Sequence, residues 1–162
     1  MHREGHVGAA MLAYAPVGGI ALALGARELA VLGYAASVVL STVPDLDLRV
    51  PLLPHRGPTH TVWFALLVGV GLGAIGAAAG CERGPLAALG TGAFGFVVGS
   101  VAIGSHVASD ALTPMGVRPF APLRDSSYSF EVARAANPVA NYALLALGVA
   151  ASAAALVLGG GL

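Results

Sequence analysis

The sequence alternates between long apolar stretches and short polar ones, and the apolar stretches have the length of membrane spans. A helix needs roughly 20 apolar residues to cross the hydrocarbon of a bilayer. Five segments meet or approach this length, namely residues 6–24, 28–43, 60–79, 86–112 and 138–158. The second is short and is expected to end at Pro44, because proline cannot continue a helix. The pattern predicts an all-α, polytopic membrane bundle of about five transmembrane helices, forming a single domain over residues 1–162.

Small residues at helical spacing predict which helices pack most closely. Gly69 and Gly73 lie four positions apart in the third segment, and Gly95 and Gly99 do so in the fourth. Such pairs let two transmembrane backbones approach each other closely. The third and fourth helices are therefore expected to form a tight pair.

Composition agrees with a location in the cell membrane and excludes other classes. Hydrophobic residues make up 57% of the chain and the mean hydropathy is +0.82, whereas soluble domains contain about 45–50% apolar residues. The net charge is zero, so no basic surface suggests a nucleic-acid partner. The single Cys81 excludes an internal disulfide and a thiolate-rich zinc site. Cleavage of the first apolar segment as a signal peptide is disfavoured, because the later segments are equally hydrophobic.

The arginines predict how the bundle is oriented. With five spans, the N-terminus and the loops 44–59 and 113–137 lie on one side of the membrane. That side carries Arg3, Arg49, Arg56, Arg118, Arg124 and Arg134. The other side carries Arg27 and Arg83. The positive-inside rule then places the N-terminus in the cytoplasm.

A polar island follows the second apolar segment. Asp45 and Asp47 are followed within sixteen positions by His55, Arg56 and His60, in a chain with only 10% charged residues. Carboxylate oxygens and imidazole nitrogens are the ligands that Zn²⁺, Mn²⁺ and iron use. The first hypothesis is a metal site. The alternative is an ordinary loop at the membrane edge, in which the aspartates cap a turn and the histidines face water.

Further candidate ligands occur on the first and fourth predicted helices. His106 and Asp110 are four positions apart, so a helix presents both on one face. His6 opens the first helix, although a lone histidine there is also typical of an interfacial residue. Because of the helix count, all of these residues fall on the side of Asp45 and His60. That common side was not assumed in counting the spans, and it favours one shared site.

Four ordered motifs carry a resemblance to a known family. They are Glu4-Gly5-His6, Val43-Pro44-Asp45-Leu46-Asp47, His55-Arg56-Gly57-Pro58-Thr59-His60, and the segment from Ser105 through His106 and Asp110 to Gly116. Together they resemble the YdjM family of membrane-bound, metal-dependent hydrolases, over residues 4 to about 123. The chain departs from the family pattern at Thr61, where serine is common, and at Ser109 and Ala111, where leucine is usual.

The resemblance implies the chemistry of the site. It implies metal ligation by His6, Asp45, Asp47, His60, His106 and Asp110, with His55 a further ligand or proton carrier. A looser similarity to all-helical zinc phospholipases implies a phosphoester substrate. So many ligands suit one or two divalent ions, Zn with Mn or Fe as alternatives, which would activate water and stabilise charge on a phosphoryl oxygen.

The candidate catalytic residues are Asp47, His55 and Arg56. Either of Asp45 and Asp47 is a candidate to bridge two ions. Arg56 would clamp a substrate phosphate, or would act only as a positive-inside anchor.

The leading hypothesis is an integral-membrane hydrolase that acts at the cytoplasmic bilayer surface on a phospholipid or other amphipathic phosphoester. A metal-ion transporter and a non-catalytic scaffold with a structural metal are the alternatives. The loop 113–137 is expected to form an interfacial lip, with Phe120, Tyr128 and Phe130 as anchors and with Arg118 and Arg124 near lipid phosphates. The oligomeric state is left open by the sequence.

Overall fold

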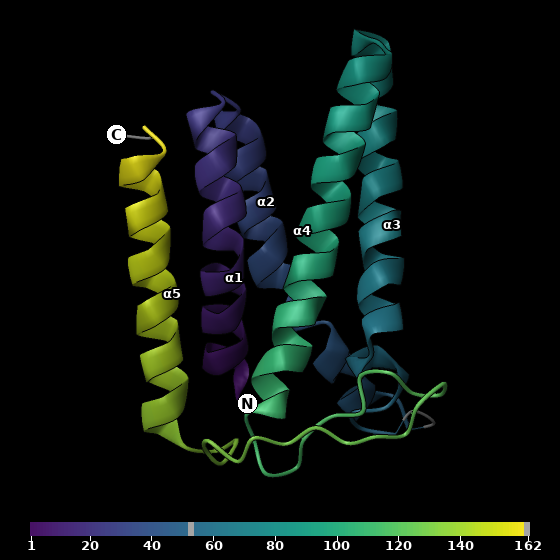
Figure 1. Cartoon of the computed structure of the whole chain (residues 1–162), viewed down its shortest axis with the longest axis vertical. Coiled ribbons are helices and arrows are strands. Elements are labelled where there is room, and N and C mark those ends of the chain that lie inside the picture. Colours follow the sequence, from purple (N-terminus) through teal and green to yellow (C-terminus); the bar gives the residue numbers. More distant parts are fainter. Residues whose placement is uncertain (52–53, 161–162) are drawn as a thin grey trace.

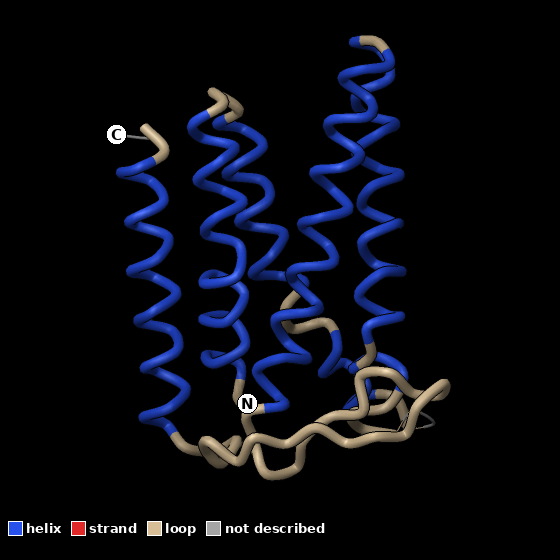
Figure 2. The backbone as a smooth tube through the Cα atoms, in the orientation of Figure 1, coloured by secondary structure: helices blue, strands red, loops and turns tan. Residues whose placement is uncertain are grey.

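The computed structural model describes residues 1–51 and 54–160, and every regular element in these ranges is helical (Figures 1 and 2). Five long helices form the bundle: α1 (Arg3–Ala23), α2 (Arg27–Leu40), α3 (Val62–Gly80), α4 (Pro85–Ala111) and α5 (Pro138–Leu158). Three short 3₁₀ helices join them: η1 (Pro44–Arg49), η2 (Pro58–His60) and η3 (Cys81–Arg83). All five long elements are long and apolar enough to cross a membrane, α2 doing so together with η1. The predicted all-α, multi-pass architecture is confirmed.

Two of the helix boundaries that differ from the prediction fall next to the polar island. The second helix ends at Leu40 and not at Val43. The Ser41 and Thr42 hydroxyls donate to the carbonyls of Val38 and Val39, and side-chain bonds of this kind compete with continuation of a helix. Asp45 and Asp47 therefore lie on the separate 3₁₀ helix η1.

The third helix begins later than predicted. His60 lies on η2, and α3 starts only at Val62. Thr61 has an extended backbone and its hydroxyl accepts a hydrogen bond from the Phe64 amide across 3.2 Å, which is the geometry of an N-cap. His60 is consequently held by a tight turn ahead of the helix.

Close helix pairs define the packing. α3 packs along α4, α5 packs along α1, and α2 lies against α1 and α4. A β carbon on Gly99 of α4 would lie 2.8 Å from the carbonyl oxygen of Val68 on α3, closer than real contacts allow. Gly8 and Gly148 produce a similar approach between α1 and α5. The predicted tight pairing of the third and fourth helices is confirmed.

The polar loops gather at one end of the bundle. The N-terminus, η1, η2, the last turn of α4 and the loop 113–137 lie together at the lower end in Figure 1, and the turns after α1 and α3 lie at the upper end. The six arginines assigned to one side therefore do share an end. The loop contains one bridge between Val117 and Tyr128 but no helix, and it crosses beneath the bundle from α4 to α5 (Figure 2).

Candidate metal centre

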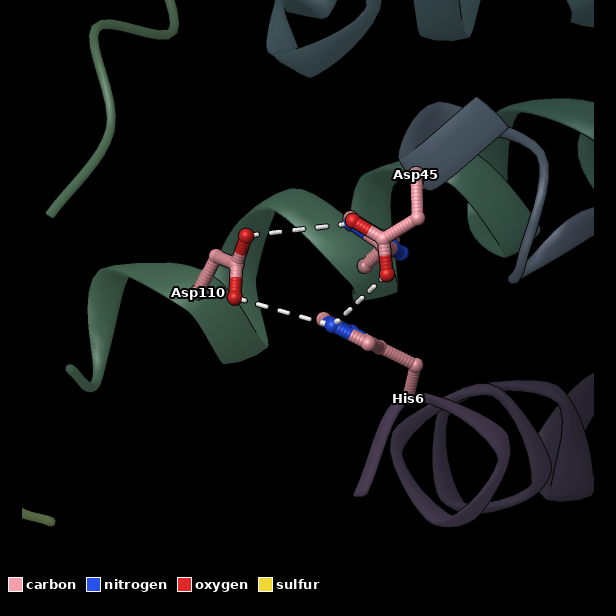
Figure 3. Close-up of side chains that lie close together, drawn as sticks. His6, Asp45 and Asp110 are labelled. Carbon is pink, nitrogen blue, oxygen red and sulfur yellow. Dashed lines mark ion pairs between the residues drawn. The ribbon is translucent and has the colours of Figure 1, made fainter. Parts of the chain in front are cut away.

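Five side chains from four elements converge at the lower end of the bundle. α1 supplies His6, η1 supplies Asp45, η2 supplies His60, and the last turns of α4 supply His106 and Asp110. Figure 3 shows His6, Asp45 and Asp110 directed at one another. All five are buried except Asp45, whose side chain is 30% exposed. The cluster is thus enclosed by the bundle and open to solvent at Asp45.

The distances among the ligand atoms have the scale of a single coordination shell. Asp45 oxygens lie 3.6 Å from His6 Nε2, 3.6 Å from His60 Nε2 and 3.5 Å from His106 Nε2. Asp110 oxygens lie 3.6, 3.5 and 3.7 Å from the same three nitrogens. Ligands about 2.0–2.2 Å from a tetrahedral Zn²⁺ are about 3.3–3.6 Å apart. The space between Asp45 and Asp110 is therefore the common point that the three imidazole nitrogens adjoin. The ligand atoms form two groups that share Asp45: His6, Asp45, His106 and Asp110, and Asp45, His55 and His60.

Hydrogen bonds fix the tautomers of two of the histidines. His106 Nδ1 lies 2.6 Å from the carbonyl oxygen of Ser41. A carbonyl can only accept, so Nδ1 carries the proton and Nε2 carries the lone pair. His60 Nδ1 lies 3.0 Å from the Thr59 hydroxyl, which itself donates to Asp47 Oδ2 across 3.2 Å. The Thr59 oxygen must therefore accept from His60, and His60 Nε2 also carries a lone pair.

His6 is fixed in the same way by a residue of α4. Its Nδ1 lies 2.8 Å from Ser109 Oγ, and that hydroxyl donates to the carbonyl oxygen of His106 across 2.9 Å. Because the hydroxyl proton is already used, the Ser109 oxygen accepts from His6 Nδ1. His6 Nε2 then carries a lone pair as well, on a ring that stacks on His106 with centroids 3.6 Å apart and an interplanar angle of 7°.

This arrangement fits a divalent metal, because several ligand atoms have no favourable partner within the protein. The Nε2 atoms of His60 and His106 are 3.1 Å apart, so two lone pairs face each other. His6 Nε2 and Asp110 Oδ2 are buried and have no hydrogen-bond partner, which is costly unless something else binds them. One proton would satisfy one pair of atoms only. One or two cations between Asp45 and Asp110 would satisfy these atoms, and a nitrogen and oxygen set of this kind suits Zn²⁺, Mn²⁺ or Fe²⁺.

Asp47 lies behind the cluster and not in it. Its Oδ1 accepts from His55 Nδ1 across 3.0 Å, and its Oδ2 accepts from the Arg56 amide and the Thr59 hydroxyl and lies 3.3 Å from His60 Nδ1. Asp47 thus accepts from the Thr59 hydroxyl that holds His60 Nδ1, and a carboxylate placed behind a metal-binding histidine in this way orients the ring. Both oxygens are occupied in this way, so the geometry favours positioning over ligation for Asp47.

His55 lies at the exposed edge of the cluster. Its side chain is 33% exposed, and one of its ring nitrogens lies within 4.8 Å of ligand atoms of Asp45 and His60. Because Nδ1 is bonded to Asp47, Nε2 is the nitrogen left to exchange a proton.

Arg56 is buried against the last turn of α4. Its guanidinium donates to Asp110 Oδ1 across 2.9 Å, to the Thr113 hydroxyl across 3.0 Å and to the carbonyl oxygen of Gly116 across 2.7 Å. Its backbone has φ +59°, a conformation that non-glycine residues rarely adopt. The amino group of Met1 also bonds Asp110 Oδ1. Asp110 is thus held by two cationic groups on one oxygen and turns the other oxygen to the common point.

The three aromatic residues of the loop expected to anchor it at the interface also lie against the helices. Phe120, Tyr128 and Phe130 line an apolar cavity of about 350 Å³ together with residues of α3 and with Val107, Ala108 and Ala111 of α4. At about 100° per residue, these α4 positions are on a different face from His106 and Asp110. The loop therefore covers the outer side of the α3–α4 pair with these aromatics.

Several groups that shape the site were not among the sequence-predicted residues. Ser109, Thr59, Thr113 and the carbonyl of Ser41 all orient a ligand or Arg56. Ser109 stood out only as a departure from the family pattern, and Thr59 as part of a motif. A backbone carbonyl such as that of Ser41 leaves no signal in a sequence. Asn141 of α5 accepts from the His2 amide and holds the start of α1 against α5.

The fold and this cluster define a class: a polytopic helical membrane protein with a buried His/Asp centre of metal-binding geometry. A family model described as "YdjM inner membrane protein" matches residues 1–160. The chain belongs to this family, and it is a multi-pass protein of the cell membrane. Neither the curated proteins nor the solved structures contain a match.

Proposed function

We propose that this protein is an integral-membrane, metal-dependent hydrolase that cleaves an amphipathic phosphoester at the bilayer surface. The observation that carries the proposal is the gathering of three histidines around the carboxylates of Asp45 and Asp110, in two groups of metal-binding spacing that share Asp45. The proposed ligands are His6, Asp45, His60, His106 and Asp110. They would hold one or two ions, and Asp45 is the residue placed to bridge two, because both groups of candidate ligands contain it.

A divalent ion held there would supply Lewis acidity towards a phosphoryl oxygen and would lower the pKa of a bound water. The chain's own residues supply the rest. His55 is placed to take up and return a proton at Nε2, because Asp47 holds its Nδ1–H and stabilises the charged ring. Asp47 also keeps His60 turned towards the centre. Arg56 is proposed to hold Asp110 in place, since its guanidinium is occupied by three acceptors from α4 and the turn after it.

The surroundings of Asp45 support an amphipathic substrate. Asp45 and His55 are the partly exposed members of the site, so substrate would arrive over them. The apolar residues Leu46, Leu48 and Val50 are exposed on and just after the same 3₁₀ helix. A polar opening flanked by exposed apolar side chains at the membrane end of a bundle suits a molecule with an acyl chain and a charged head.

The transporter alternative has less support. A permeation path needs polar or ionisable groups along its length. Among the described residues, the acids outside the site end are Glu28 and Glu82, and both lie at the opposite end of the bundle. In the part of the chain that the structure describes, no acidic side chain lies between the two ends.

The test combines metal analysis with lipid hydrolysis. Wild-type protein in nanodiscs is expected to contain near-stoichiometric Zn, Mn or Fe by elemental mass spectrometry and to hydrolyse phospholipids, followed by lipid mass spectrometry. His106→Ala should lose both properties. His2→Ala, which changes an exposed histidine outside the cluster, should lose neither. A wild-type protein that binds metal but hydrolyses no phosphoester would refute the activity, and one that binds no metal after reconstitution would refute the site.

A further inference from the structure

The structure assigns Ser109 as a positioning residue that selects the tautomer of His6 and thereby makes His6 a ligand. This inference rests on the proposed metal centre and adds a residue to it. Ser109 is buried on α4, one turn after His106 and directly before Asp110 in sequence. Its hydroxyl is the hydrogen-bond partner of the His6 side chain.

The direction of each hydrogen bond carries the argument. Ser109 has one hydroxyl proton, and it goes to the carbonyl oxygen of His106 across 2.9 Å. The oxygen can then only accept from His6 Nδ1 across 2.8 Å. This forces the ring proton onto Nδ1 and leaves Nε2 free for a cation.

Without the hydroxyl, the electrostatics of the site favour the other tautomer. His6 Nε2 lies 3.6 Å from an oxygen of Asp45 and 3.6 Å from an oxygen of Asp110. If Nδ1 has no acceptor, a proton on Nε2 is stabilised by both carboxylates and lies where the cation would bind. This proton then competes directly with the metal for His6 Nε2. Losing such an orienting partner lowers metal affinity by about 10–100-fold.

Ser105 provides a matched control on the same helix. It is also buried, and its hydroxyl donates to the carbonyl of the residue three positions earlier, Ala102, across 2.8 Å. It bonds no histidine. Ser105→Ala and Ser109→Ala therefore remove the same local helix bond, and they differ in the contact with His6.

The experiment measures Co²⁺ affinity of the purified, detergent-solubilised chain from its visible absorption. Ser109→Ala is expected to bind about 10–100-fold more weakly than wild type, and Ser105→Ala and the hydroxyl-retaining Ser109→Thr should bind nearly as wild type does. In a His6→Ala background, Ser109→Ala should cause no further loss, because its effect runs through His6. Nitrogen NMR of the metal-free wild type should show the His6 proton on Nδ1, a readout that does not depend on any variant folding.

Three results would overturn the assignment. They are wild-type affinity in Ser109→Ala, an equal loss in the presence and absence of His6, or an Nε2 proton on His6 in the wild type. Each of these can occur while the wild type binds Co²⁺ normally, so the proposed metal centre would survive. Absence of Co²⁺ binding by the wild type would instead overturn the metal centre and this inference together.

Discussion

Asp47 joins the rings of His55 and His60: its Oδ1 lies 3.0 Å from His55 Nδ1 and its Oδ2 lies 3.3 Å from His60 Nδ1. One buried carboxylate therefore serves a histidine at the exposed edge of the site and another at its centre. The two rings lie nearly perpendicular, with centroids 5.4 Å apart. Changes at Asp47 should affect both metal binding and proton transfer, whereas changes at His55 should affect proton transfer alone.

Asp47→Asn is expected to weaken metal binding by about 10–100-fold. Asparagine offers one acceptor oxygen where the carboxylate offers two, and its amide group would face donors from His55, Arg56 or Thr59. His60 then loses the partner that orients it. Metal content after dialysis against a weak chelator would measure the effect, with the exposed Asp125→Asn as control. Unchanged metal retention in Asp47→Asn would contradict the positioning role.

His55→Ala is expected to keep its metal and lose turnover by about 10²–10⁴-fold, the usual contribution of a general acid or base. The ring is not needed to complete the shell formed by His6, Asp45, His60, His106 and Asp110. Metal analysis beside phospholipid hydrolysis would separate the two effects. Loss of metal and activity in parallel would make His55 a ligand instead.

Arg56→Ala is expected to destabilise the site end of the bundle, because the buried Asp110 carboxylate loses its guanidinium partner. The cost should stay below the roughly 3–5 kcal/mol of an uncompensated buried charge, since the Met1 amino group still bonds Asp110. Metal affinity should fall as well, since Asp110 is held by one group fewer. Thermal unfolding and metal content would measure both, with the exposed Arg118→Ala as control. An Arg56→Ala protein with full metal content and stability that fails only on phosphoesters would show instead that Arg56 binds the substrate phosphate.

Two glycines of α4 should respond to alanine with opposite signs. A β carbon on Gly99 would lie 2.8 Å from the Val68 carbonyl oxygen, whereas one on Gly90 meets nothing within 4 Å. Gly99→Ala should therefore push α3 and α4 apart and cost about 1–3 kcal/mol. Gly90→Ala should be neutral or stabilising by up to about 1 kcal/mol, the difference in helix propensity. Unfolding in detergent would compare them, and equal effects would contradict the close approach at Gly99.

The five spans and the end of the bundle that holds the site are properties of the sequence by itself. The length of an apolar segment is a local quantity, and each span reverses the direction of the chain. The parity of the spans therefore placed His6, Asp45, His60, His106 and Asp110 at one end without any knowledge of packing. The arginine distribution follows from the same count, as does the tight contact of α3 with α4 from the glycine spacing.

The separate roles of the residues in the cluster were decided by tertiary structure. Asp45 and Asp47 are two positions apart and chemically identical, so only the path of η1 determines that one faces the common point and the other faces His55. From the sequence, Arg56 was a candidate to bind a substrate phosphate. In the structure, the left-handed backbone at this residue directs its guanidinium to Asp110 and to the turn after α4. The orientation of His106 depends on a backbone carbonyl at Ser41, and that of His6 on a hydroxyl 103 positions away. Hydrogen-bond partners so far apart in the chain are chosen by how the helices pack, and no local pattern records that choice.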